Sequence, residues 1–220
     1  LPDPVQVAHA EVHRFARAAA WSVSFLGAVY AVVTVLGLHS LPSPDAPIAD
    51  PFFSLMEGLI LLMAPLMVMT MAALYAYAAP RDRVYALMAL ACMTILAGLT
   101  SCVHIVILTV GDRIAATPGG PLLVSFTWPS VVYALDILAW DWFFALAMLC
   151  AVPVFTPSGL ERRLRALMIV CGVLSLAGLI GVPLGDMAIR NFGILGYGLL
   201  APVVFFLLGV VLGRPPGTGS

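Results

Sequence analysis

Charged residues are scarce in this chain of 220 residues: they make up 10% of it, and Lys is absent, so all basic residues are Arg. A soluble domain carries about 25% charged residues. The net charge of −1 leaves no basic footprint, and we expect no nucleic-acid partner. Hydrophobic residues make up 62%, which predicts an integral membrane protein in a lipid bilayer. The lack of Lys beside abundant Ala, Gly and Pro favours a bacterial cytoplasmic membrane.

Catalytic and redox motifs are also missing. The chain contains no HExxH, GxSxG, histidine box, CxxCH or nucleotide-binding motif, so nothing in it indicates an enzyme family. None of the Cys residues forms a CxxC pair, and all lie in apolar runs, which is typical of packing residues. His9 and His13 lie four residues apart, but Glu11 is one position too late for HExxH, so we favour a solvated pair over a metal site.

Six long apolar runs are what the chain does have. A membrane-spanning helix needs about 20 apolar residues, and none of the runs alternates as a barrel strand would. The sequence therefore predicts an all-α bundle of six transmembrane helices in a single membrane domain over 1–220. Residues 1–17 are expected to be a cytoplasmic or interfacial segment that includes a short amphipathic helix. The expected spans are 18–38, 52–79, 84–110, 130–155, 164–184 and 192–212.

The arginines are divided unequally between the two sides of such a bundle. Arg residues concentrate in the cytoplasmic loops of membrane proteins, and here eight fall on the side of the termini and two on the other. The sequence therefore predicts that both termini are cytoplasmic. The eight are Arg14, Arg17, Arg81, Arg83, Arg162, Arg163, Arg165 and Arg214, and the two are Arg113 and Arg190.

A few ionisable residues lie inside the apolar runs. A charged side chain at the bilayer centre costs roughly 3 kcal/mol on insertion scales. Counted at about 1.5 Å per residue from the outer helix ends, Glu57, His104 and Asp136 share one depth on three helices. We therefore expect them to converge in an outward-facing pocket. Regular α-helical geometry points Asp141 away from Asp136 and predicts a helix–helix contact for it.

Neighbouring residues extend this candidate site. Thr100 and Ser101 share a small, polar stripe with His104, whereas Tyr133 and Trp140 share a face with Asp136 and offer a wall for a cation or ring. These residues together form the predicted ligand-binding set. The last two spans are rich in Gly, which predicts close helix packing and favours packing within the chain over a subunit interface. Asp186 and Arg190, four residues apart, are suited to an ion pair if the helix continues that far.

Three interpretations of the polar residues stay open. They lock the bundle by bonding to each other or to Arg113, Arg190 and Tyr133, they bind a ligand or ion, or they carry out chemistry. In the last case His104, Glu57 and Asp136 form a metal or acid–base set. Haem is disfavoured because His104 is the one His inside a span. We favour a non-enzymatic protein that binds or transports a small ligand or ion. The alternatives are a subunit of a larger membrane complex or homo-oligomer, and a membrane enzyme acting on a lipid-soluble substrate.

Overall fold

The computed structural model describes residues 4–43 and 46–214, with side chains from residue 11 onward. Every regular element in these ranges is a helix. Six helical stretches are long and apolar enough to cross a membrane, which confirms the all-α, multi-pass bundle. They are Glu11–His39, Phe52–Tyr77, Arg83–Ala115, Val131–Val154, Gly159–Leu184 and Asn191–Leu212.

Three of these spans are single α-helices, and three are built from shorter pieces. The single helices are α1 (Pro4–His39), α2 (Phe52–Tyr77) and α3 (Arg83–Ala115). The short α4 (Pro121–Val124) lies in the connection that follows α3. The fourth span joins α5 (Val131–Ile137), the π-helix η1 (Leu138–Phe143), α6 (Phe144–Ala151) and the 3-10 turn η2 (Val152–Val154). The fifth span consists of α7 (Gly159–Gly178) and α8 (Gly181–Leu184). The sixth consists of α9 (Asn191–Ile194), the π-helix η3 (Leu195–Leu200) and α10 (Ala201–Leu212).

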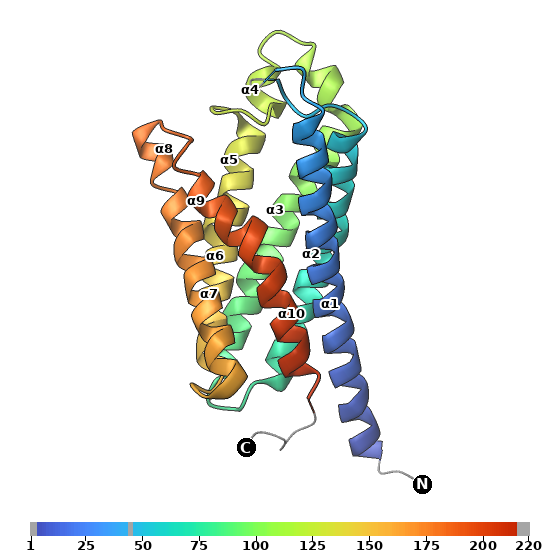
Figure 1. Ribbon diagram of the computed structural model, residues 1–220, viewed down its shortest axis with the longest axis vertical. Coiled ribbons are helices and arrows are strands. Elements are labelled where there is room, and N and C mark those ends of the chain that lie inside the picture. The colour runs from blue at the N-terminus through green and yellow to red at the C-terminus, as the bar shows by residue number, and fades with distance from the viewer. Residues whose placement is uncertain (1–3, 44–45, 215–220) are drawn as a thin grey trace.

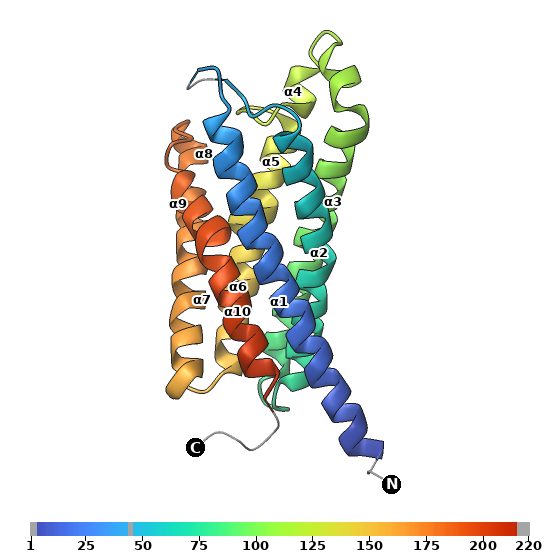
Figure 2. The same cartoon turned by 45° about the vertical axis from the view of Figure 1, so that its right-hand side comes forward.

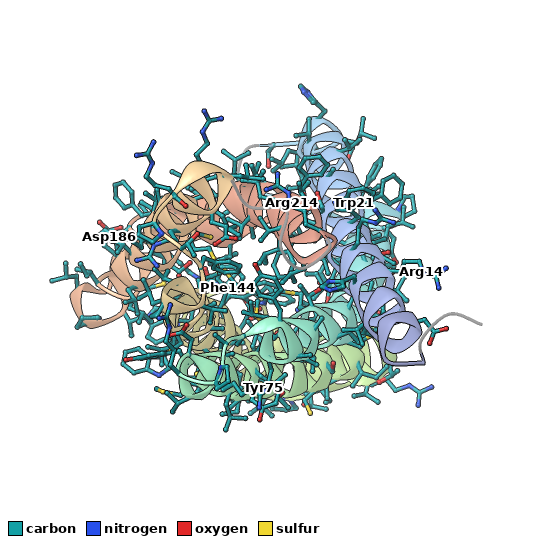
Figure 3. All side chains as sticks on the ribbon, turned by 90° about the horizontal axis from the view of Figure 1, so that it is seen from below. Arg14, Trp21, Tyr75, Phe144, Asp186 and Arg214 are labelled. Carbon is teal, nitrogen blue, oxygen red and sulfur yellow. The ribbon has the colours of Figure 1, made fainter. Side chains whose placement is uncertain are left out.

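The helices form a closed ring. Along the ring α1 packs on α2, α2 on α3, α3 on α6, α6 on α7, and α7 on η3, while α10 returns to α1. Figure 3 looks along this ring from below, with Phe144 pointing into it and Tyr75 on its outer rim. Since each helix packs mainly against its two neighbours, only side chains can fill the middle of the bundle.

Both termini lie at one end of the bundle, which we call the termini end (Figure 1). The opposite, loop end carries α4 and the connections 40–51 and 116–130. The large core cluster fills the termini end, with Met71, Leu74 and Leu208 fully buried. At the loop end a second, smaller cluster surrounds Val103 and Val132.

Local chemistry accounts for several helix ends at the loop end. Ser130 caps α5 by accepting a hydrogen bond from the Tyr133 N–H (3.2 Å), as N-cap serines do. The Ser54 hydroxyl and N–H donate to Asp50 at the start of α2, which lowers the pKa of this exposed carboxyl. Gly185 ends α8 in the left-handed conformation (φ 66°), for which Gly carries little steric cost.

The segment before the first span differs from expectation. Residues 8–17 do not form a separate interfacial helix; they belong to α1, which runs without a break from Pro4 and projects beyond the other helices (Figure 2). His13 Nδ1 lies 2.7 Å from the Leu212 carbonyl oxygen, so its ring fastens α1 to the end of α10. The side chain of His9 lies outside the described residues.

Candidate functional site

Glu57, His104 and Asp136 meet at the loop end of the ring, as their common depth in the sequence predicts. His104 Nδ1 lies 2.6 Å from Glu57 Oε2, and His104 Nε2 lies 3.8 Å from Asp136 Oδ1. All three residues are buried. The imidazole therefore bridges α2 and α5 from its place on α3, and only its Nδ1 side makes a close hydrogen bond.

Arg190 completes this cluster, in agreement with the interpretation in which the polar residues bond to an arginine. Its guanidinium donates from Nη2 to Asp136 Oδ2 (2.6 Å) and from Nε to Asp141 Oδ2 (3.2 Å), and it lies 4.4 Å from the centroid of the Tyr133 ring. The pair with Asp186, predicted for a helix that continues to Arg190, does not form, because the helix ends at Gly185 and the following turns carry Arg190 inward. Asp186 Oδ1 instead accepts a hydrogen bond from the Ala188 N–H (3.0 Å).

Asp141 also departs from its predicted direction. An α-helix turns about 100° per residue and would separate Asp136 from Asp141, but η1 interrupts the α-helix between them. A π turn closes i→i+5 hydrogen bonds, so residues five apart come onto nearly the same face. Both carboxylates consequently reach one guanidinium, and we refer to Glu57, His104, Asp136, Arg190 and Asp141 as the charge cluster.

A notch between two glycines holds Asp141. A Cβ built on Gly178 or on Gly193 would overlap Asp141 Oδ1, and the two glycines lie against each other, with Cα of Gly193 3.1 Å from the Cβ built on Gly178. The side chain of Asp141 is fully buried, and Oδ1 has no hydrogen-bond partner. The glycines of the last two spans thus serve intramolecular packing, as expected, and one pair of them admits a charged group.

A cavity of about 410 Å³ opens beside the charge cluster, inside the ring. Four members of the cluster line it, namely Glu57, His104, Asp136 and Arg190. The walls away from the cluster are apolar and come from α1, α2, α9, η3 and α10, with the loop residues Pro47 and Ile48 at the loop end. They include Val23, Met56, Ile60, Met63, Met67, Ile194, Ala201, Pro202 and Phe205.

Aromatic rings surround the polar end of this cavity. Trp140 lines it as predicted, next to Tyr197, with ring centroids 5.4 Å apart. Phe126 covers the His104 ring at a centroid distance of 5.7 Å and is also a lining residue. Tyr133 packs edge-on against Phe126 and lies under Arg190 rather than in the lining. The sequence did not predict Phe126, Tyr197 and Tyr30 as lining residues. Phe126 lies in the loop before α5, and Tyr30 and Tyr197 lie on the first and sixth spans, for which no side facing the pocket was predicted.

The remaining predicted residues are less directly involved. Thr100 is fully buried, but its hydroxyl has no hydrogen-bond partner, and Ser101 is half-buried; neither lines the cavity. Both π-helices face the cavity, η1 with Trp140 and η3 with Tyr197 and Gly198. Pro202 follows η3 and lacks the N–H that a regular helix would donate, which accounts for the irregular turn there. π turns are frequent at functional sites.

The geometry does not suit a metal ion on His104, Glu57 and Asp136. Among the side chains that the structure describes, those of residues 11–43 and 46–214, no group of three or more from His, Cys, Asp or Glu is arranged to hold one. Glu57 already engages the imidazole, and the cation beside Asp136 is the Arg190 guanidinium. Nor do the described residues give His104 an imidazole partner, since His39 is exposed at the end of α1.

Comparison with known proteins adds no relative. Neither protein-family models nor curated proteins nor solved structures yield a match to this chain.

Proposed function

We propose that this multi-pass membrane protein binds a small amphipathic molecule in the cavity at the loop end. The observation that carries the proposal is a cavity of about 410 Å³ with charged groups gathered at one end and apolar walls along the rest. Ligand pockets typically measure about 300–1,000 Å³ and combine apolar walls with a few convergent polar groups. The head of such a molecule would lie against the charge cluster and its body among the methionines of α2.

Binding has more support than free passage. Below the cavity the ring is closed by fully buried side chains, including Met71, Leu74 and Phe144. A transported molecule would need these side chains to separate. We therefore assign the described conformation to ligand binding, and transport would require a second conformation open at the termini end.

The alternative of an accessory subunit has less support. That interpretation expects a filled core and small residues on the outer face of the bundle. Instead the glycine pairs are used inside the bundle, where Gly196 packs on Cys171 and Ser175 and Gly193 packs on Gly178. The cavity meanwhile leaves the core incompletely filled at the loop end.

Blocking the cavity tests the proposal. The probe is 1-naphthalenemethanol, an uncharged apolar ring with one hydroxyl, measured by equilibrium dialysis against the purified protein in lipid nanodiscs. Met63→Trp fills the cavity from α2 and Ala201→Phe fills it from α10, since both residues line it. Met88→Trp is the matched control because Met88 is 49% exposed on the outer face of α3. We expect saturable binding by the parent and control, and a loss of about tenfold or more in the two cavity variants.

Equal binding by all four proteins, or saturable binding by none, would overturn the proposal. Size-exclusion profiles and melting temperatures check that the cavity variants remain folded.

We further propose that the loop end faces the outside of the cell, as the Arg distribution indicates. A reporter that is active only in the cytoplasm should work when fused at the C-terminus or at Ser158, and should be silent at Pro118. Activity at Pro118 with silence at Ser158 would reverse the orientation of the cavity.

A further inference from the structure

We infer that the head of the bound molecule is a protonated amine. This inference rests on the proposed binding function and adds the chemical class of the ligand. Its first support is the charge balance of the cluster, in which, among the described side chains, the carboxylates of Glu57, Asp136 and Asp141 face one Arg and one imidazole. Even with His104 protonated, the acids exceed the cations by one. A ligand cation would supply the missing charge in a region where unbalanced charge is costly.

The position of Arg190 argues against an anionic head. Its guanidinium is shared by two carboxylates, Asp136 Oδ2 at 2.6 Å and Asp141 Oδ2 at 3.2 Å, and one of its faces lies over the Tyr133 ring. An anion would have to displace Asp136 from Arg190 and would then lie beside the Glu57 and Asp136 carboxylates. The only guanidinium at the cavity wall among the described residues is thus already neutralised.

An unused nitrogen shows where the amine would bind. His104 is 2% exposed and lines the cavity, and its Nε2 has no hydrogen-bond partner among the described residues. When Nδ1 donates to the Glu57 carboxylate, the neutral ring presents an Nε2 lone pair, 3.8 Å from Asp136 Oδ1. Two acceptors so close together lack a donor between them. An ammonium group has several N–H donors and can satisfy both at once.

The aromatic rings at this end of the cavity suit a cation as well. Tyr30, Phe126, Trp140 and Tyr197 line the cavity, and the Phe126 ring lies against His104 with ring centroids 5.7 Å apart. Aromatic rings attract ammonium groups electrostatically, most strongly when water is excluded. Carboxylates, a free nitrogen and aromatic rings therefore converge at one end of the cavity, and the apolar remainder accepts a hydrocarbon body.

Three probes that share one ring test the inference. They are 1-naphthalenemethylamine, which is protonated at neutral pH, the uncharged 1-naphthalenemethanol, and the anion 1-naphthaleneacetate. Each is measured by equilibrium dialysis against the full chain in nanodiscs of zwitterionic lipid, with empty nanodiscs subtracted. We expect the amine to bind at least about tenfold more tightly than the alcohol, and the acetate to bind most weakly.

Substitutions test whether the carboxylates cause the preference for the amine. Glu57→Gln and Asp136→Asn each remove one negative charge while keeping the shape of the side chain, so each should reduce the preference for the amine over the alcohol by about tenfold. The preference is the ratio of the two affinities within each variant, and size-exclusion profiles and melting temperatures check that the variant is folded. Asp50→Asn is the matched control, because Asp50 is an exposed carboxylate that does not line the cavity.

The outcomes separate this inference from the proposed function. If the alcohol and the amine bind equally well in the parent, or the acetate binds best, the amine inference is overturned and the cavity proposal stands. If a preference for the amine persists in both carboxylate variants, the inference is likewise overturned, because the carboxylates then do not determine which probe binds more tightly. If none of the probes binds saturably, the proposed function fails with it.

Discussion

The interior of the helix ring is filled differently at the two ends of the bundle. At the termini end, methionine, leucine and phenylalanine side chains such as Met71, Leu164 and Phe155 are almost completely buried against one another. At the loop end the space inside the ring holds a cavity, two carboxylates that line it, and an imidazole and a guanidinium beside them. One end is packed as a protein core is, and the other is left polar and open.

The difference indicates where stability and function reside. Burial and tight packing stabilise the termini end. Burial of the charge cluster removes charged groups from water, which costs free energy. It also leaves His104 Nε2 and Asp141 Oδ1 without hydrogen-bond partners among the described residues, which is a second cost. Apolar residues at these positions would fill the ring at lower cost. Polar groups that cost stability at a cavity are typical of a binding site.

Arg190 should be the residue on which the loop end depends most. Arg190→Met leaves the buried carboxylates of Asp136 and Asp141 without their cation, so we expect a loss of about 3–5 kcal/mol in the free energy of unfolding. Unfolding by denaturant in detergent micelles measures it. Arg162→Met is the control, since Arg162 is exposed on α7, and should stay within about 0.5 kcal/mol of the parent.

The double variant Arg190→Met/Asp141→Asn sharpens this test. It removes one of the two stranded charges, so it should be more stable than Arg190→Met alone. Equal stability of Arg190→Met and the parent would contradict the ion pairs on which the charge cluster is built.

The notch that holds Asp141 gives a second, smaller effect. Gly193→Ala places a methyl group where Asp141 Oδ1 lies, and overpacking of this kind costs about 1–3 kcal/mol. Gly98→Ala is the matched control, because a Cβ at Gly98 meets nothing within 4 Å, and Ala in a helix interior is favoured by up to about 1 kcal/mol over Gly. Thermal unfolding of the two variants should shift in opposite directions. A stable Gly193→Ala protein would show that Asp141 can move out of the notch.

The sequence predicts much of the fold because each span is a long apolar run bounded by breakers. The second span begins at Phe52 and the sixth ends at Leu212, as expected, since prolines or charged residues flank the runs. The meeting of Glu57, His104 and Asp136 follows from depth alone, which needs only the rise of a helix.

The features of the site that the sequence does not predict depend on irregular backbone geometry. Asp141 reaches Arg190 because η1 changes the angular step of the fourth span, and no residue type marks a π turn by itself. Arg190 turns inward because the helix ends at Gly185; the predicted end of the fifth span at 184 agrees with this, but the path of the turns that follow is not predicted from the sequence. The cavity, likewise, depends on how far side chains fill the ring.

A pair of buried threonines offers the finest comparison between the two ends. On α2 the Thr70 hydroxyl donates to the Leu66 carbonyl oxygen (2.9 Å), whereas on α3 the equally buried Thr100 hydroxyl has no partner. Thr70→Val should therefore cost about 0.5–1.5 kcal/mol, the net contribution of one hydrogen bond. Thr100→Val removes only an unsatisfied group and should leave stability unchanged or raise it by up to about 1 kcal/mol. Since Thr100 does not line the cavity, binding of the naphthalene probes should be unaffected. A destabilised Thr100→Val protein would mean that this hydroxyl has a partner, such as a buried water, and that the polar region at the loop end extends beyond the charge cluster.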